Sequence, residues 1–393
     1  MFTFAGKLHI NNFSCIMANV IKIKKGLDIN LKGKASDVLL NGGKSESYAI
    51  VPDYYNGILP KVVAKVGEKV KAGSVLMIDK NRPEIKFVSP VSGEVTAVNR
   101  GEKRKVLSIV VKPDAQIEYE EFGKKNVASL QGAEVKEVLL NAGMWPFIKQ
   151  RPYDIVAAPL DTPRDIFVSA FYSAPLAPNF DFIVKGQEAD FQTGLNALAK
   201  LTNGKVYVGV RSGSVVSGVK GVEIVEVEGP HPAANVGVQI NHIKPVNKGE
   251  VVWTVNMDGY LGAYDNQITV IPEGDETHEF LGFAMPRFNQ FSASHSYFSW
   301  LGTSKEYVID ARIKGGKRAM IMSNEYDKVF PMDIYPEYLL KAIIAFDIDK
   351  MENLGIYEVA PEDFALCEFV DTSKIELQKI VRDGLNLLYK EMN

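Results

Sequence analysis

The chain has 393 residues, of which 46% are hydrophobic and 24% charged, and its formal net charge is −3. This length accommodates two to four domains, and the composition is typical of globular proteins. The slightly acidic balance argues against a nucleic-acid-binding protein, which usually carries a basic surplus. Because the sequence contains no stretch of 18 apolar residues, it predicts no membrane-spanning helix.

The cysteine and histidine content excludes several kinds of site. Cys15 and Cys367 are the only cysteines, too few for a secreted disulfide framework or for the four ligands of an iron–sulfur cluster. The five histidines lack the spacing of a zinc site. We therefore expect neither a cluster nor a metal site, and a cytoplasmic location.

Residues 17–115 are expected to hold N-terminal strands and a small β-barrel. The preceding residues 1–16 lack the apolar core of a secretory signal, and we interpret them as an optional leader. Within residues 61–111, two β-rich halves flank a tight turn, and glycines stand at the bends. Each half has one small apolar face to bury against the other. These faces comprise Val62, Ala64, Val66, Val91, Gly93, Val95 and Ala97.

Residues 131–258 alternate between helical and strand patterns. Val135, Val138, Leu139 and Ala142 repeat at helical spacing before Gly143, which predicts a helix that ends there. Because helices separate the strands, the pattern predicts a parallel, doubly wound, Rossmann-like α/β domain. The strands are predicted at residues 166–171, 206–210, 222–227 and 251–255, and a further helix carries Phe191, Leu195 and Leu198.

The last third of the chain changes character. Residues 259–330 combine short β-prone runs with glycines and aromatic residues, which predicts a small β-rich segment. Residues 331–393 are predicted to form a helical domain, with Pro336 opening one helix and a capping box of Ser373 and Glu376 before the last. The apolar face of the last helix should pack within its own domain. Its members are Leu377, Ile380, Val381, Leu385 and Leu388.

Two glycine-rich segments imitate nucleotide-binding motifs, but neither has the required spacing. Residues 209–213 lack the Gly-x-Gly-x-x-Gly fingerprint of dinucleotide-binding folds. Residues 213–221 resemble a P-loop, yet Val219 separates Gly218 from Lys220, whereas the lysine must follow the glycine directly. We interpret these glycines as loop residues at strand ends.

The segment Gly229-Pro-His-Pro-Ala-Ala-Asn-Val-Gly237 follows a predicted strand. It therefore lies at the carboxyl edge of the sheet, where α/β folds place ligands. Pro230 and Pro232 stiffen the backbone around His231. Either the loop positions the imidazole to donate a hydrogen bond to a ligand, or it packs against the barrel with His231 bonded to a carbonyl group.

The predicted barrel resembles the fold of biotinyl and lipoyl carriers, and Lys80 lies in the turn between its halves, where those carriers present a modified lysine. Asp79 fits the lipoyl pattern, but Arg82 and Pro83 depart from the carrier sequences, so an unmodified structural lysine is favoured. A second ambiguous feature is a dense set of aromatic residues, which could line a pocket for a flat quinone ring or pack as ordinary core. The set comprises Phe283, Phe288, Phe291, Tyr297, Phe298 and Trp300.

Several motifs in chain order resemble one family. They include Lys25-Gly-Leu-Asp28, the barrel, Arg151-Pro-Tyr153, Gly229-Pro-His-Pro232, Leu281-Gly-Phe-Ala-Met-Pro286 and Phe364-Ala-Leu-Cys367. From Met17 to the C-terminus the series resembles the A subunit family of the sodium-translocating NADH:quinone reductases. One departure is that Asn256-Met-Asp-Gly-Tyr260 directly joins two segments between which the family has a soluble-ligand-binding β-grasp domain.

The resemblance implies a peripheral subunit on the cytoplasmic side of the bacterial inner membrane. Its partners would be the other subunits of a complex that oxidises NADH, reduces ubiquinone or menaquinone, and transports Na⁺. It further implies that quinone is the ligand and that the chain holds no covalent cofactor, flavin or iron–sulfur centre, so the isolated chain is not expected to be catalytic. The alternatives are a lipoyl- or biotin-type carrier modified at Lys80, and an autonomous NADH-oxidising flavoenzyme.

Within this picture, the stiff loop after the third strand of the α/β domain is our candidate for quinone contact. The contact residues we expect are Pro230, His231, Pro232 and Asn235. We expect the quinone between this loop and the barrel. We also expect the N-terminal strands and the barrel, residues 21–111, to face the other subunits.

Overall fold

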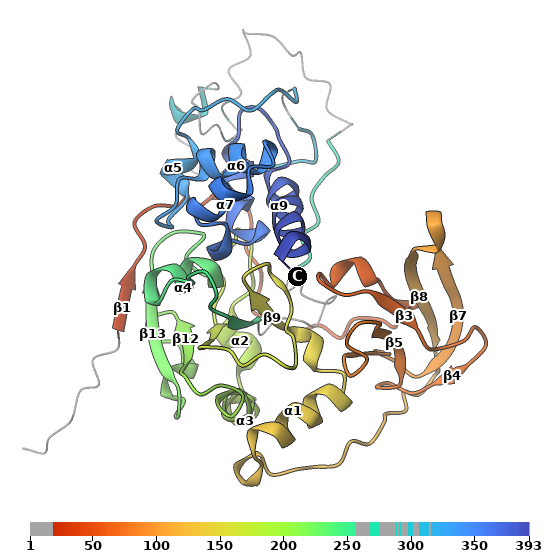
Figure 1. Cartoon of the computed structure of the whole chain (residues 1–393). Helices are drawn as coiled ribbons and strands as arrows, with labels where there is room; N and C mark the ends of the chain where they lie inside the picture. Colours follow the sequence, from red (N-terminus) through yellow and green to blue (C-terminus); the bar gives the residue numbers. More distant parts are fainter. Residues whose placement is uncertain are drawn as a thin grey trace, which may run out of the picture.

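The computed structural model describes residues 19–256, 267–274, 288, 291, 298–301, 306–313 and 316–392. Figure 1 shows three parts: two small sheets near the N-terminus, a central sheet with helices around it, and a group of C-terminal helices. The predicted multidomain α/β architecture with a helical C-terminus is confirmed.

The first part contains two antiparallel sheets that share one core, with strand orders β2–β8–β7–β4 and β3–β5–β6. The bounds are β2 Tyr48–Ile50, β3 Pro60–Val62, β4 Lys69–Val70, β5 Val75–Asp79, β6 Lys86–Val88, β7 Gly93–Arg100 and β8 Val106–Pro113. Of the residues expected to point inward, Ala64, Val91 and Val95 are buried, whereas Val66 is 62% exposed. Val66 is exposed because it lies in the turn between β3 and β4, which is closed by a 3.1 Å hydrogen bond from the Glu68 N–H to Lys65 O.

One arginine docks these two sheets on the central sheet. Arg82, in the turn between β5 and β6, donates hydrogen bonds to Asp79 Oδ2 at 2.7 Å, Gly57 O at 2.8 Å and Val156 O at 3.2 Å. The Val156 N–H donates in turn to Asn56 O at 3.0 Å. The barrel part therefore lies against the edge strand β10 (Ile155–Val156).

The central sheet has seven strands in the order β1–β13–β12–β11–β14–β9–β10. The remaining bounds are β1 Asn19–Lys22, β9 Ile148–Arg151, β11 Ile166–Ser169, β12 Val206–Val210, β13 Glu223–Glu228 and β14 Val252–Asn256. The strands from β1 to β14 in this order are parallel, and β9 is antiparallel to both β14 and β10. The four strands predicted for the α/β domain correspond to β11, β12, β13 and β14.

The strand β1 belongs to this sheet, which corrects its predicted place beside the barrel. It pairs in parallel with β13, with Ile21 opposite Val227. The Ile23 N–H extends this pairing with a 2.8 Å hydrogen bond to Glu228 O, and Ile23 is buried in one cluster with Val225 and Val227. The edge of β13 offers both free hydrogen-bonding groups and an apolar surface, and a strand with alternating isoleucines satisfies both.

Helices cover both faces of the parallel strands. The helix α3 (Glu188–Ala199) packs Leu195 into the same core as Val168 of β11, as its helical spacing predicted. The helix α4 (Val236–Ile243) packs Ile240 against Phe167, the neighbouring β11 residue, which points to the opposite face. The predicted first helix is α1 (Gly132–Asn141), and α2 (Phe180–Val184) was not predicted.

The C-terminal part contains five helices in the described chain: α5 Tyr326–Val329, α6 Pro336–Ile344, α7 Ile348–Asn353, α8 Ala365–Val370 and α9 Leu377–Met392. Four of the five residues predicted for the apolar face of α9 are fully buried, namely Leu377, Val381, Leu385 and Leu388, whereas Ile380 is half-buried. Cys367 is also buried in this core. Figure 1 shows these helices next to α4 and the upper ends of the central strands.

The predicted capping box before α9 does not form. Ser373 Oγ is buried with no hydrogen-bond partner among the described residues, and Glu376 forms an ion pair with Lys317 instead. Glu368 of α8 accepts the Gln378 N–H at 3.0 Å and so caps α9 from a separate helix. A tertiary contact thus replaces the local one that the sequence pattern predicted.

The described residues within the predicted β-rich segment at 259–330 form no strand. They contain the short 3₁₀ helix η6 (Phe298–Leu301), the helix α5, and an isolated bridge between Tyr307 and Leu31. The remainder of this segment, including Phe283 and Tyr297, lies outside the described residues.

Candidate functional site

A polar cavity of about 80 Å³ lies at the carboxyl ends of the parallel strands. Ser169 at the end of β11 and Ser173 in the following segment line one side. Asn235, at the start of α4, lines another side, and Glu362 reaches the cavity from the C-terminal part. This is the edge at which open α/β sheets bind ligands, and the lining is rich in hydroxyl, amide and carboxylate groups.

The imidazole of His231 lies beside this cavity. Its Nδ1 is 3.0 Å from Ser173 Oγ, and the same Oγ accepts a 3.0 Å hydrogen bond from the Ala234 N–H. The Ser173 hydroxyl hydrogen is then free to bond Nδ1, an arrangement that places the proton of the neutral imidazole on Nε2. Burial lowers the pKa of His231, although the carboxylate of Asp28 opposes this effect. The neutral, Nε2-protonated ring is therefore the form expected at pH 7.

The N-terminal segment holds the loop that carries His231. The His231 N–H donates to Asp28 Oδ1 at 2.8 Å, and the Leu27 N–H donates to His231 O at 2.8 Å. Gly26, with φ of 145°, lies so close that an added Cβ would be 2.3 Å from His231 O, so a side chain at this position would displace the loop. The contact partner predicted for this loop was the barrel, and the structure corrects that prediction. The barrel lies at the β10 edge of the sheet, whereas the loop follows β13 near the opposite edge.

The four predicted contact residues have different positions in this arrangement. Asn235 lines the cavity, and its Nδ2 donates to Glu362 O at 3.1 Å. Pro232 is buried, and Pro230 packs against the backbone at Gly26. His231 is half-buried and joins the cavity only through Ser173. The structure therefore brings the four residues together and adds Ser169, Ser173 and Glu362, which sequence reasoning missed.

A buried ion network joins the C-terminal part to the sheet close to this cavity. Arg151 of β9 is 1% exposed, and its guanidinium donates to Glu358 O at 2.8 Å and to Asp363 Oδ2 at 3.2 Å. Asp363 is also 1% exposed, and an added Cβ on Gly237 of α4 would lie 2.4 Å from its Oδ2. A buried arginine is tolerated only with such partners. The Arg151-Pro-Tyr153 motif was noticed in the sequence, but its arginine was not interpreted. This arginine is the signal that could have indicated the network.

The glycine-rich segments serve packing and turns, as interpreted. An added Cβ on Gly209 would lie 2.1 Å from Gln239 Oε1, so this glycine allows α4 to approach β12. Asp181 Oδ1 accepts hydrogen bonds from the Ser214 hydroxyl at 2.5 Å and from the Val215 N–H at 3.2 Å. The carboxylate of Asp181 thus occupies the start of η5 (Val215–Gly218), where a P-loop would hold a phosphate.

The Lys80 turn and the aromatic set are partly described. Lys80 is exposed, and its N–H donates to Leu59 O at 2.7 Å in the turn that Arg82 holds against β10. Phe291 packs against Phe369 with ring centroids 5.2 Å apart, whereas Trp300 is 53% exposed.

The described residues contain no group of three or more His, Cys, Asp or Glu placed to hold a metal ion. No helix in the described part of the chain has the length and apolar character needed to cross a bilayer.

The chain is similar to known proteins along most of its length. Residues 21–114 match the family described as the NqrA N-terminal barrel-sandwich hybrid domain, and residues 130–261 match the NqrA second alpha/beta domain. The A subunits of the Na(+)-translocating NADH-quinone reductases are 32% identical to this chain in Hahella chejuensis, 32% in Vibrio anguillarum and 30% in Neisseria meningitidis. Each alignment covers 95% of this chain and 100% of the relative. The alignments span 447 or 448 positions, more than the 393 residues of the chain, so the relatives have residues at positions where this chain has none.

Proposed function

We propose a function for this chain on the ground that it belongs to the family of the A subunits of the Na(+)-translocating NADH-quinone reductases. In our proposal the chain is a peripheral component of such a complex, on the cytoplasmic side of the membrane. It contributes contacts to quinone and holds other subunits in place. NADH oxidation, quinone reduction and Na⁺ transport are activities of the whole complex, and the redox centres belong to its other subunits.

The observation that carries this proposal is the extent of the similarity, which covers the full length of the relatives and both domain families in order. The order β13–β12–β11–β14 supports a Rossmann-like reading of the second domain, since it repeats the 3-2-1-4 order of that fold. We further propose that the positions absent from this chain correspond to the β-grasp domain missing between residues 256 and 260. The carrier and flavoenzyme alternatives find no support in the names of the relatives.

For quinone contact we propose the cavity at the carboxyl edge of the sheet. A quinone carbonyl is a hydrogen-bond acceptor, and the neutral His231 ring has its Nε2–H as the matching donor. Ser173 fixes the ring from the other nitrogen, and the 229–235 backbone is held by Asp28, so the donor is oriented before the ligand arrives. The cavity itself is small, about 80 Å³, so the proposal places the quinone head at its mouth rather than within it.

The test is a titration of the purified chain with a short-chain ubiquinone. Binding is measured as the quenching of tryptophan fluorescence. His231→Ala should weaken binding about fivefold, the equivalent of one hydrogen bond of about 1 kcal/mol. His242→Ala is the matched control, because His242 lies on α4 and its ring bonds the Val238 carbonyl, at 2.9 Å, within its own helix. Unchanged affinity of the His231 variant, with thermal unfolding like that of the wild type, would show that the loop is purely structural.

A further inference from the structure

An apolar groove runs between α6 and α9 in the C-terminal part. Its volume is about 230 Å³, and it is lined by Ile343, Ile344 and Phe346 on one side and by Ile380, Gly384 and Leu387 of α9 on the other. The helices approach closely at Gly384, where an added Cβ would lie 2.8 Å from Ile343. Ile344 is 47% exposed and Phe346 is 74% exposed. The groove therefore leaves apolar side chains in contact with water.

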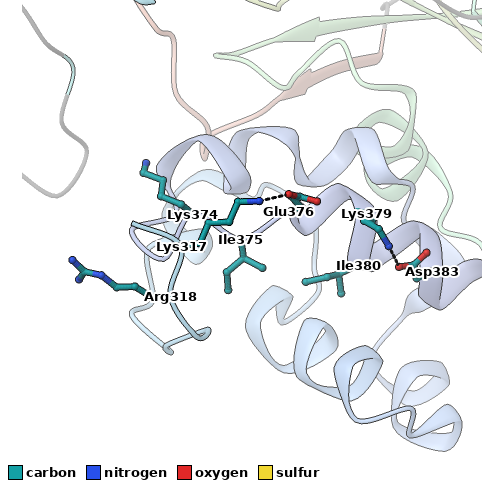
Figure 2. A pocket seen from close by; sticks show the side chains of 8 residues that line it. All are labelled: Lys317, Arg318, Lys374, Ile375, Glu376, Lys379, Ile380 and Asp383. Carbon is teal, nitrogen blue, oxygen red and sulfur yellow. Dashed lines mark hydrogen bonds and ion pairs between the residues drawn. The ribbon is translucent and has the colours of Figure 1, made fainter. Parts of the chain in front are cut away.

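A basic pocket of about 290 Å³ continues this groove along α9 and shares Ile380 and Asp383 with it. Figure 2 shows Ile375 and Ile380 pointing into the pocket, with charged side chains around them. The segment that supplies Lys317 and Arg318 is fixed by a 2.8 Å hydrogen bond from the Arg318 N–H to Ser373 O. The groove and the pocket thus form one continuous amphipathic surface, which we name the α6–α9 groove.

The charges around the pocket are predominantly positive. Four cationic side chains line it against two carboxylates, and both carboxylates are already paired, Glu376 with Lys317 and Asp383 with Lys379. The side chains of Arg318 and Lys374 have no hydrogen-bond or ion-pair partner among the described residues, and Figure 2 shows both extended away from the two ion pairs. This local excess contrasts with the net charge of −3 of the whole chain. Two cations at the rim are therefore available to an acidic partner.

Phe346 provides a second, independent observation. Its φ of 56° is typical of the residue that follows a helix, since the Asp347 N–H donates to Ala342 O and the Phe346 N–H to Ile343 O, both at 3.0 Å, and its ring is largely exposed. These two hydrogen bonds fix the backbone at the end of α6 and hold Phe346 in the lining of the groove. An aromatic ring held at the mouth of an apolar groove has the character of a binding anchor.

We infer that the α6–α9 groove is the docking site for an acidic amphipathic helix of a partner subunit. This inference rests on the proposed function, because the partner is a component of the same complex. A helix fits the groove because its apolar residues, spaced three and four apart, can enter the space between α6 and α9, and its acidic residues can meet Arg318 and Lys374. A concave groove is a poor match for a flat lipid surface, and its position between two helices suits a third helix that packs along them.

The inference is tested in the assembled complex, purified from membranes through a tag on this chain. A photoreactive benzoylphenylalanine is placed at position 346, and at Leu160 as control, since Leu160 is exposed but remote from the groove in sequence. Position 346 should cross-link to another subunit, and digestion should identify a segment with an acidic face. Arg318→Glu with Lys374→Glu should lower the yield about fivefold, the equivalent of about 1 kcal/mol. Lys185→Glu with Lys220→Glu should leave it unchanged.

Several outcomes would overturn the inference. One is a cross-link from position 346 only to lipid or only to this chain itself. Another is no cross-link at all. A third is a cross-link yield that stays the same in the Arg318→Glu and Lys374→Glu variant. Binding of the isolated chain to phosphatidylglycerol vesicles, lost in the Arg318 and Lys374 variant, would instead assign the surface to lipid. Failure of the proposed function is distinguishable, because the tagged chain would then copurify with no other subunit. A complex that copurifies intact without a cross-link from 346 refutes only the docking site.

Discussion

The carboxylate of Asp154 is predicted to be a major link between the α/β sheet and the C-terminal helices. It is 4% exposed in the turn after β9, and it pairs with Lys149 at 2.6 Å and with Arg382 of α9. Burial alone would raise its pKa, but Lys149 and Arg382 outweigh burial and lower the pKa from 3.8 to about 2. A difference of this size corresponds to about 2 kcal/mol of stability at pH 7. Because Asp154→Asn also leaves two cations without their carboxylate, we expect a loss of about 2–4 kcal/mol.

The assay is urea unfolding of the wild type and Asp154→Asn from pH 7 down to pH 3. The stabilisation from Asp154 is fully present above the unfolded pKa of 3.8 and is lost as the pH falls toward 2, so the difference between the two proteins should shrink below pH 4. Asparagine tolerates the φ of 50° at this position, so backbone strain adds little. Asp383→Asn, which breaks an exposed pair with Lys379, is the matched control and should cost less than about 1 kcal/mol. Equal losses in the two variants, or a difference that does not change below pH 4, would refute the reasoning.

Three further predictions concern the cores and the barrel contact. Arg82→Met should lower the free energy of unfolding by about 3 kcal/mol, because it leaves Asp79 buried without its cation. It should also speed proteolysis within residues 114–126, since Arg82 holds the barrel against Val156. Unchanged cleavage would show that other contacts dock the barrel. Gly209→Ala should cost about 1–3 kcal/mol in urea unfolding, because the new methyl group would meet buried Gln239, whereas Gly218→Ala, where an added Cβ meets nothing within 4 Å, should be nearly neutral. In a Cys15→Ser background, Cys367 should react with a thiol reagent only after unfolding, since Cys367 is buried and burial raises the pKa of its thiol. Rapid reaction of the folded chain would contradict the position of Cys367 in the core.

Elements with a strong local pattern could be predicted from the sequence. The strand β12 was predicted at its observed bounds, and α6 begins at Pro336 as expected, because a buried apolar run and a first-turn proline are local signals. The helix α3 was predicted from the spacing of Phe191, Leu195 and Leu198, all of which are buried. These residues specify structure through their own neighbours in the chain.

Features that depend on distant residues could not be predicted. Ile21 could pair with either the barrel or β13, and only the completed sheet decides between them. Arg151 and Asp363 are 212 positions apart, so no spacing rule joins them. The position of the 229–237 loop, after β13 at the carboxyl edge of the sheet, could be predicted from the strand that precedes it, whereas its role as a quinone site stays a prediction. The predicted contact of this loop with the barrel was wrong, because its partner Asp28 lies 203 positions from His231, with the whole barrel between them in the sequence.

Whether this chain works within a Na⁺-translocating reductase is tested most directly by purifying the tagged chain from membranes of its own host and assaying Na⁺-stimulated NADH:quinone reductase activity. We predict that the chain copurifies with the other subunits and with this activity. We also predict that deletion of its gene abolishes the activity in the membranes, and that a plasmid-borne copy restores it. Copurification with no partner, or full Na⁺-stimulated activity in membranes that lack the chain, would contradict the proposed function.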